Sequence, residues 1–177
     1  MQLSHQTSDA TALREPPLPA RIQIRPLEPS DRAGLAALFR RLSPESRRRR
    51  FLVPKPELSA RELTYLTAVD HRAHEALAAV DRRDGSIVGV ARYAGVVGRP
   101  GVADAAVAVA DDWQRQGIGT ALTRCLLGRA RANEFDVVTA STLWDNRPAR
   151  RLLRRLGFLA RGSEGSVIEL ELDLWAA

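Results

Sequence analysis

The chain has 177 residues, enough for one domain with a sizeable core, and its 45% hydrophobic content is typical of a soluble globular protein. No apolar run approaches the ~20 residues of a transmembrane helix, and residues 1–20 lack the apolar segment of a signal peptide. The net charge of +6 favours an anionic ligand. Nucleic-acid binding is a competing interpretation, but an aromatic fraction of 5% without an interleaved stacking platform argues against it.

Capping residues, turn residues and apolar periodicity divide the chain into elements. Residues 1–20 are polar and then proline-rich, which predicts a disordered leader, followed by a single domain over residues 21–177. Strands are predicted at 21–25, 75–81, 87–93, 103–110, 137–143, 158–161 and 167–174. Helices are predicted at 31–41, after 43, after 59, at 118–133 and from 147 to Gly157. This order predicts an α+β fold with a mixed, twisted sheet.

Three local predictions accompany these elements. Ser30 is expected to cap the first helix, and Ser59-x-x-Glu62 is a capping box for the third. The single cysteine, Cys125, excludes an internal disulfide and indicates a cytoplasmic protein. We expect Cys125 on the apolar face of its helix, in a packing role.

The stretch Val107–Leu127 predicts an apolar strand, a tight turn and an amphipathic helix. The turn contains Gly117 and Gly119, and glycine lets a backbone approach a ligand closely. The unpaired N–H groups at the start of a helix can hold a phosphate or pyrophosphate. The spacing fits neither a dinucleotide fingerprint, which needs a third glycine, nor a Walker loop, because the only lysine is Lys55. An ordinary tight turn is the alternative.

Two motifs carry a family resemblance. The turn has the pattern Q-x-x-G-x-G, and about thirty residues later follow Asn146-x-x-Ala149-x-x-Leu152-Leu153-x-x-x-Gly157-Phe158. Together they resemble the GNAT N-acetyltransferases. The resemblance implies a sheet of about seven strands flanked by four or five helices, with acetyl-CoA bound between two diverging strands and no metal. The cofactor-binding residues it implies are Val107, Val109, Gln114, Arg115, Gln116, Gly117, Ile118, Gly119, Thr120 and Asn146.

Several phrases are similar to the Pat-type protein lysine acetyltransferases within that family. Among them are Leu42-Ser43-Pro44-Glu45-Ser46, His74-Glu75-Ala76-Leu77, Gly89-Val90-Ala91-Arg92-Tyr93 and Val109-Ala110-Asp111-Asp112-Trp113-Gln114. This resemblance implies an amine acceptor, either a protein lysine or a small amine, and leaves a homodimer open. We expect Arg47–Arg50 to form a solvated helix face; gripping an acidic substrate or a CoA phosphate is the alternative.

The resemblance also assigns the chemistry. Asp104 stands where Pat-type enzymes carry their general base, usually a glutamate, although it also reads as an exposed residue at the start of a strand. His71, His74 and Glu75 are alternative bases. The backbone N–H of Val109 is the expected donor to the thioester oxygen.

Leu153 occupies the position where many family members have a tyrosine that protonates the CoA sulfur. We therefore expect no side-chain acid near the sulfur, unless a hydroxyl such as that of Thr142 or Tyr93 takes its place. Asn146 is expected to contact CoA, to cap a helix, or to do both. Because of Leu153 and the short Asp104, the alternative to an active N-acyltransferase is a weakened, acyl-CoA-binding regulatory module.

Overall fold

A computed structural model of the chain describes residues 17–176, which form one seven-stranded sheet and five α-helices. The strands are β1 (Ile22–Pro26), β2 (His74–Asp81), β3 (Ile87–Gly95), β4 (Val102–Val109), β5 (Val137–Leu143), β6 (Leu159–Glu164) and β7 (Val167–Asp173). The helices are α1 (Arg32–Arg41), α2 (Pro44–Phe51), α3 (Ala60–Thr67), α4 (Ile118–Ala132) and α5 (Arg147–Arg155). Short 3-10 turns, η1 (Pro29–Asp31) and η2 (Asp111–Trp113), precede α1 and α4. Most of the predicted leader lies outside the described residues.

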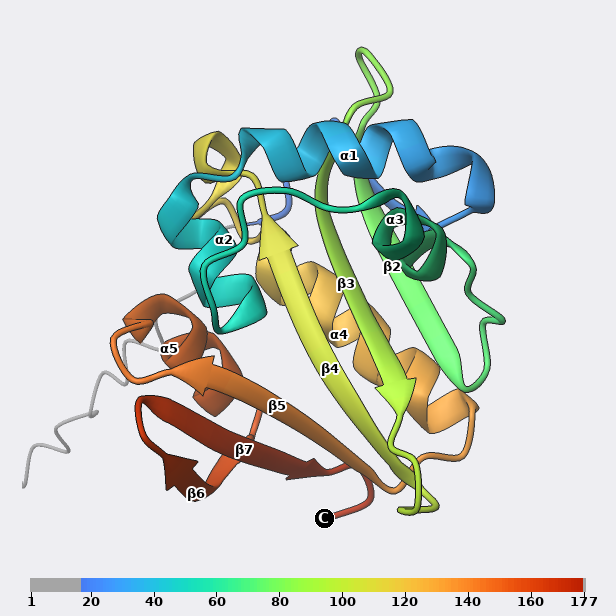
Figure 1. The fold of residues 1–177 in the computed structure, drawn as a ribbon. Coiled ribbons are helices and arrows are strands. Elements are labelled where there is room, and N and C mark those ends of the chain that lie inside the picture. Colours follow the sequence, from blue (N-terminus) through green and yellow to red (C-terminus); the bar gives the residue numbers. More distant parts are fainter. Residues whose placement is uncertain (1–16, 177) are drawn as a thin grey trace, which may run out of the picture.

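The sheet has the strand order β1-β2-β3-β4-β5-β7-β6, and every neighbouring pair is antiparallel except β4 and β5. Figure 1 shows α1, α2 and α3 in front of the sheet and α4 behind it. Strands β2 and β3 are buried along most of their length because helices cover both of their faces. The predicted α+β fold with a mixed sheet is therefore confirmed.

The sheet divides into two parts between β4 and β5. These strands pair only where Val102–Asp104 lies beside Val137–Thr139. Beyond that point β4 stays paired with β3 as far as Val109, while β5 stays paired with β7 as far as Leu143. Each strand follows its own antiparallel partner, and the two diverge (Figure 1). The divergence implied by the family resemblance is confirmed.

The start of the first helix differs from the prediction. Ser30 lies inside η1 and does not cap α1. A reciprocal capping box between Glu28 and Asp31 closes η1, with the Glu28 N–H donating to Asp31 Oδ2 at 2.8 Å. Glu28 and Asp31, rather than Ser30, cap this segment, because a capping box satisfies two helix-end donors at once. The other predicted box, between Ser59 and Glu62, is confirmed.

Cys125 is exposed, so the prediction that it packs in the core is wrong. The buried stripe of α4 instead runs through Leu122, Leu126 and Ala130, and Thr123 joins it. Each residue turns the helix by about 100°, so Cys125, the residue before the buried Leu126, points away from this stripe. In the part of the chain that the structure describes, no helix is both long and apolar enough to cross a membrane.

Candidate functional site

A cavity lies where β4 and β5 diverge. Its wall includes residues of β4 and β5, of α2 on one face of the sheet and of α4 on the other face. The cavity therefore extends through the sheet rather than along one face. The wall is formed by Arg49, Arg50, Ala105, Ala106, Val107, Thr123, Leu126, Ala140, Ser141, Thr142, Asn146, Ala149, Leu152, Leu153 and Phe158. Nine of these fifteen side chains are apolar, and six are polar or charged. Such a passage suits an extended, mostly apolar chain held at a few polar points.

The predicted glycine turn leads from β4 into α4. Gly117 has φ 79° and Arg115 has φ 60°, both in the left-handed region, which turns the backbone sharply into the helix. The Gln114 side chain is held inside the turn, because its Nε2 donates to Val109 O at 3.1 Å. The first-turn amides of α4, beginning at Ile118, have no carbonyl four residues earlier in the helix to receive them. This end of the helix can therefore accept an anion.

Gly119 has a second reason to be glycine. A Cβ at this position would lie 3.3 Å from Leu152 Cδ1 and 3.7 Å from Val109 Cγ2. The start of α4 therefore packs against α5 and the end of β4. The lack of a side chain serves this packing as well as any close approach of a ligand.

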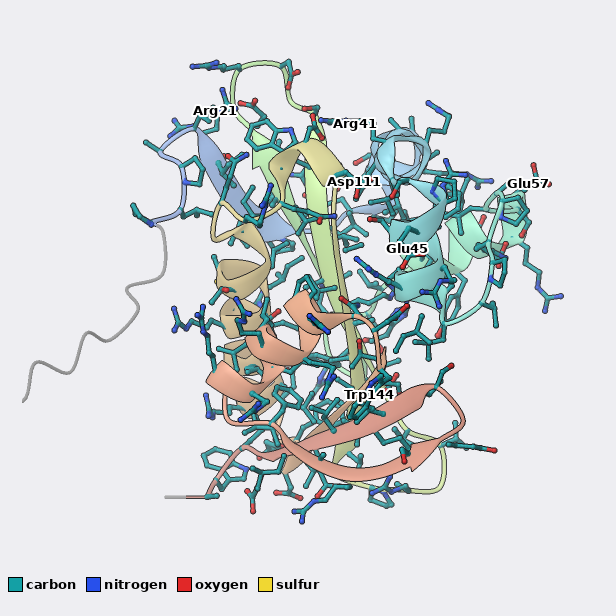
Figure 2. The ribbon with its side chains drawn as sticks, turned by 90° about the vertical axis from the view of Figure 1, so that its left-hand side faces the viewer. Arg21, Arg41, Glu45, Glu57, Asp111 and Trp144 are labelled. Atoms are coloured by element: carbon teal, nitrogen blue, oxygen red, sulfur yellow. The ribbon has the colours of Figure 1, made fainter. Side chains whose placement is uncertain are left out.

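The turn is tied to the start of α2. Asp111 accepts from the Ser43 N–H at 2.5 Å and from the Ser46 hydroxyl, and Arg41 pairs with Asp112 at 2.7 Å. Although burial opposes it, these hydrogen bonds and the one from Gln114 lower the pKa of Asp111. Figure 2 shows Arg41, Asp111 and Glu45 along this side of the molecule, where the turn meets α1 and α2. The glycine turn and α2 are thus held together by these contacts.

The arginine run in α2 is not a solvated face, contrary to the prediction. All four side chains are partly buried, and they have different contacts. Arg47 donates to Pro56 O at 2.7 Å, and Arg48 pairs with Asp145 beyond the end of β5 at 2.6 Å. Arg49 pairs with Glu45 on its own helix at 2.8 Å. Helix α2 therefore connects the β4 side of the opening to the β5 side.

Asp104 lies on β4 at the last residue that pairs with β5. Thr139 of β5 donates its hydroxyl hydrogen to Asp104 Oδ1 at 2.9 Å. Asp104 is exposed, as its alternative interpretation expects, but loss of hydration is still the main cause that raises the pKa of its carboxyl. The Thr139 hydrogen bond and the charge of Arg50 oppose this rise without cancelling it. A raised pKa makes Asp104 a stronger base than an ordinary aspartate.

The alternative bases separate onto the two faces of the sheet. Glu75 is fully buried on the α4 side, where its Oε1 accepts from the Ala76 N–H at 2.9 Å and lies 2.6 Å from His71 Nδ1. The structure does not bring this pair to Asp104. His74 shares a face with Asp104, because both pair with Ala94 of β3 from opposite sides.

The region near Leu153 contains a buried hydroxyl, that of Thr142. Leu153 is buried in the cavity wall, as is Thr142, whose Oγ1 has no hydrogen-bond partner within the described residues. Tyr93 is committed elsewhere, with its hydroxyl donating to Arg72 O at 3.0 Å. Asn146 caps α5 by accepting from the Ala149 N–H at 3.3 Å and also lines the cavity, so it can fill both predicted roles.

Arg50 and Arg92 also lie at this site, and the sequence patterns single out neither of them individually. A signal for Arg92 was present, because it is a charged residue inside the apolar stretch of a buried strand. Arg50 differs from the rest of its run only through its position at the end of α2. Among the described residues, no group of three or more His, Cys, Asp or Glu side chains could hold a metal ion.

Comparison with known proteins agrees with this geometry. The sequence model of the acetyltransferase (GNAT) family matches residues 37–158. Acetyltransferase PA5475 of Pseudomonas aeruginosa is 35% identical over 142 residues, which cover 79% of this chain and 76% of that protein. Acetyltransferase Pat of Mycolicibacterium smegmatis is 28% identical over 165 residues, or 89% of this chain. The chain spans about half of that relative's length, 49%.

Solved structures show the same fold. The GNAT domain of S. lividans PAT superposes with a TM-score of 0.80 at 26% identity, covering 86% of this chain and 90% of that one. The yncA protein of Salmonella typhimurium, solved with acetyl-CoA, gives a TM-score of 0.71 at 18% identity, covering 87% and 94%. The latter match supports the fold alone. The family match, the relatives and the shared architecture show that the chain belongs to the acetyltransferase (GNAT) family, whose members are N-acetyltransferases.

Proposed function

We propose that this enzyme transfers an acetyl group from acetyl-CoA to a primary amine, by direct attack of the amine while both substrates are bound. The observation that carries the proposal is the cavity between β4 and β5. Its wall includes Thr123, whose hydroxyl donates to Gly119 O in the first turn of α4, and Ala105, the residue after Asp104. A cavity with an anion site near one end and a base near the other would suit a thioester that carries a pyrophosphate.

The residues fit acetyl-CoA in three places. The amides of Gln116–Thr120 would hold the pyrophosphate, because they lie at the positive end of α4. Val107 and Asn146 line the passage that the pantetheine arm would follow. The hydroxyl of Thr142 is buried there without a partner, and such a group is costly unless a ligand satisfies it.

Asp104 would remove the proton from the attacking amine, because a protonated ammonium has no lone pair. As the amine attacks the thioester carbon, negative charge moves to the carbonyl oxygen, and the Val109 N–H would receive it. The C–S bond then breaks and the thiolate leaves. A thiol with a pKa near 8.5 leaves without a strong acid, so Leu153 is compatible with turnover.

The single cysteine supports the expectation of a cytoplasmic enzyme.

The Asp104→Asn variant tests the base. It keeps the size of the side chain but cannot take a proton, so acetyl-CoA affinity should persist. The turnover number should fall by about 10²–10⁴-fold, the range of general bases. Glu169→Gln is the matched control, because Glu169 is a nearby carboxylate that only raises the pKa of Asp104. Amines of different pKa would separate enzyme ionisation from substrate ionisation.

Turnover within a few-fold of wild type in Asp104→Asn would reject Asp104 and leave His74 as the alternative on the same face. The second candidate function, a regulatory module that binds acyl-CoA, is favoured by the absence of a side-chain acid at Leu153. Steady-state release of the CoA thiol with a panel of amines distinguishes the two. Release with at least one amine supports the enzyme, whereas tight binding without release supports the module.

A further inference from the structure

Two arginines converge beside Asp104 on the face of the sheet that carries α2 and α3. Arg92 of β3 pairs in register with Ala106 of β4, two residues from Asp104, so their side chains share that face. Its exposed fraction is only 7%. Arg50 comes from the end of α2, lines the cavity and interacts electrostatically with both Asp104 and Arg92.

Within residues 17–176, neither arginine forms an ion pair. Arg92 donates to Leu66 O at 3.2 Å and contacts the His74 ring, and its guanidinium lies 5.7 Å from the centre of the Tyr65 ring. Arg50 lies 4.9 Å above the Phe51 ring. A buried charge is normally paired with an opposite one.

The charge balance of this cluster is positive. Burial and the charge of Arg50 lower the pKa of Arg92 to about 10, which still leaves it charged at neutral pH. Burial and Arg92 lower the pKa of His74, so this ring is neutral. Glu169 lies near Asp104, but among the described residues the carboxylate that acts on Arg50 is Asp104, and none acts on Arg92. With Asp104 ionised, the two guanidinium groups therefore share one carboxylate. An additional anion would remove the excess charge.

We propose that the acceptor is a small amine that also carries a carboxylate, bound by Arg50 and Arg92 a few bonds from the amine that Asp104 deprotonates. This inference rests on the proposed function. The short separation follows from the strand register, because Ala106, the residue of β4 that pairs with Arg92, is two residues from Asp104 on the same face. Tyr65, stacked on His74 with ring centres 5.1 Å apart and 60% exposed, provides an aromatic wall at the edge of this site. An amino acid has the required arrangement of amine and carboxylate.

The test compares L-amino acids with the corresponding L-amino acid amides, which have the same side chain but no carboxylate. Release of the CoA thiol gives kcat/KM for each substrate. Each value is then expressed per concentration of neutral amine, because the amine of an amino acid amide has a lower pKa than the amine of the amino acid. Wild type should prefer the acid by at least about tenfold, the usual value of a charged hydrogen bond. In Arg92→Gln and Arg50→Gln, assayed at a pH above the acidic limb of each pH–rate profile, this preference should disappear, because kcat/KM should fall much more for the acid than for the amide. Arg40→Gln, an exposed arginine at the end of α1, is the control for loss of charge.

A binding measurement keeps the two proposals separate. Propionate and propionamide are titrated by calorimetry into the enzyme with CoA present, and circular dichroism confirms that each variant is folded. Propionate should bind more tightly than propionamide to wild type and lose that advantage in Arg92→Gln. Such binding without turnover on any amine would retain the anion site and reject the transferase. Equal use and equal binding of acid and amide, or turnover restricted to lysine in peptides, would overturn the inference.

Discussion

Replacing Thr142 by valine should stabilise the free protein and impair its reaction. The Thr142 side chain is 2% exposed, and its hydroxyl has no partner within the described residues. Leaving such a group unsatisfied costs about 1–3 kcal/mol, and valine has nearly the same shape without the hydroxyl. For a chain of this size, each 1 kcal/mol gained should raise the melting temperature by about 2–4 °C. If the hydroxyl donates to bound acetyl-CoA, its removal should lower kcat/KM by about two- to tenfold.

Thr123→Val is the matched control. Thr123 lines the same cavity and is 4% exposed, but its hydroxyl already donates to Gly119 O at 2.8 Å. Its replacement should therefore lower the melting temperature or leave it unchanged. Thermal melts by circular dichroism and release of the CoA thiol measure both effects. A loss of stability in Thr142→Val equal to that in Thr123→Val would show that the Thr142 hydroxyl is satisfied in the free protein.

Two further predictions concern α4 and the base. Gly128→Ala should stabilise the protein by about 1 kcal/mol, because alanine favours a helix and its Cβ would meet nothing within 4 Å. In Gly119→Ala the new Cβ would lie only 3.3 Å from Leu152 Cδ1, so the free energy of unfolding, measured with denaturant, should rise little or fall. An equal rise in Gly119→Ala and Gly128→Ala would contradict the packing at Gly119. Arg50→Gln should raise the pKa of Asp104, because the charge of Arg50 lowers it. Since only the ionised carboxylate accepts a proton, the acidic limb of the pH–rate profile should move to higher pH; no movement, or movement to lower pH, would show that Arg50 does not act on the base.

The features that could be predicted from the sequence depend on neighbouring residues. The capping box at Ser59 needs only a partner three residues away, and the turn at Gly117 needs only a residue that accepts a positive φ. The strand over residues 137–143 follows from its apolar composition. Where two local signals competed, as at Ser30, the residue type alone predicted the wrong cap. Cys125 was misplaced for a similar reason, because one helical step separates the buried stripe from the exposed face.

The site depends on packing between distant elements, and the sequence does not show it. Four consecutive arginines look alike in sequence, but α2 lies across the opening between β4 and β5, so only Arg50 both lines the cavity and acts on Asp104. Arg92 and Thr142 acquired their roles in the same way. A strand pattern predicts that a residue is buried, whereas the partner it meets depends on strand register and on which helix covers that face. By itself, the sequence determined the order of elements, the glycine turn at the start of α4 and the family resemblance. Among the described residues, the tertiary structure decided that Arg92 is buried without an ion pair and that the Thr142 hydroxyl is buried without a hydrogen bond, because burial and pairing depend on segments far apart in the chain.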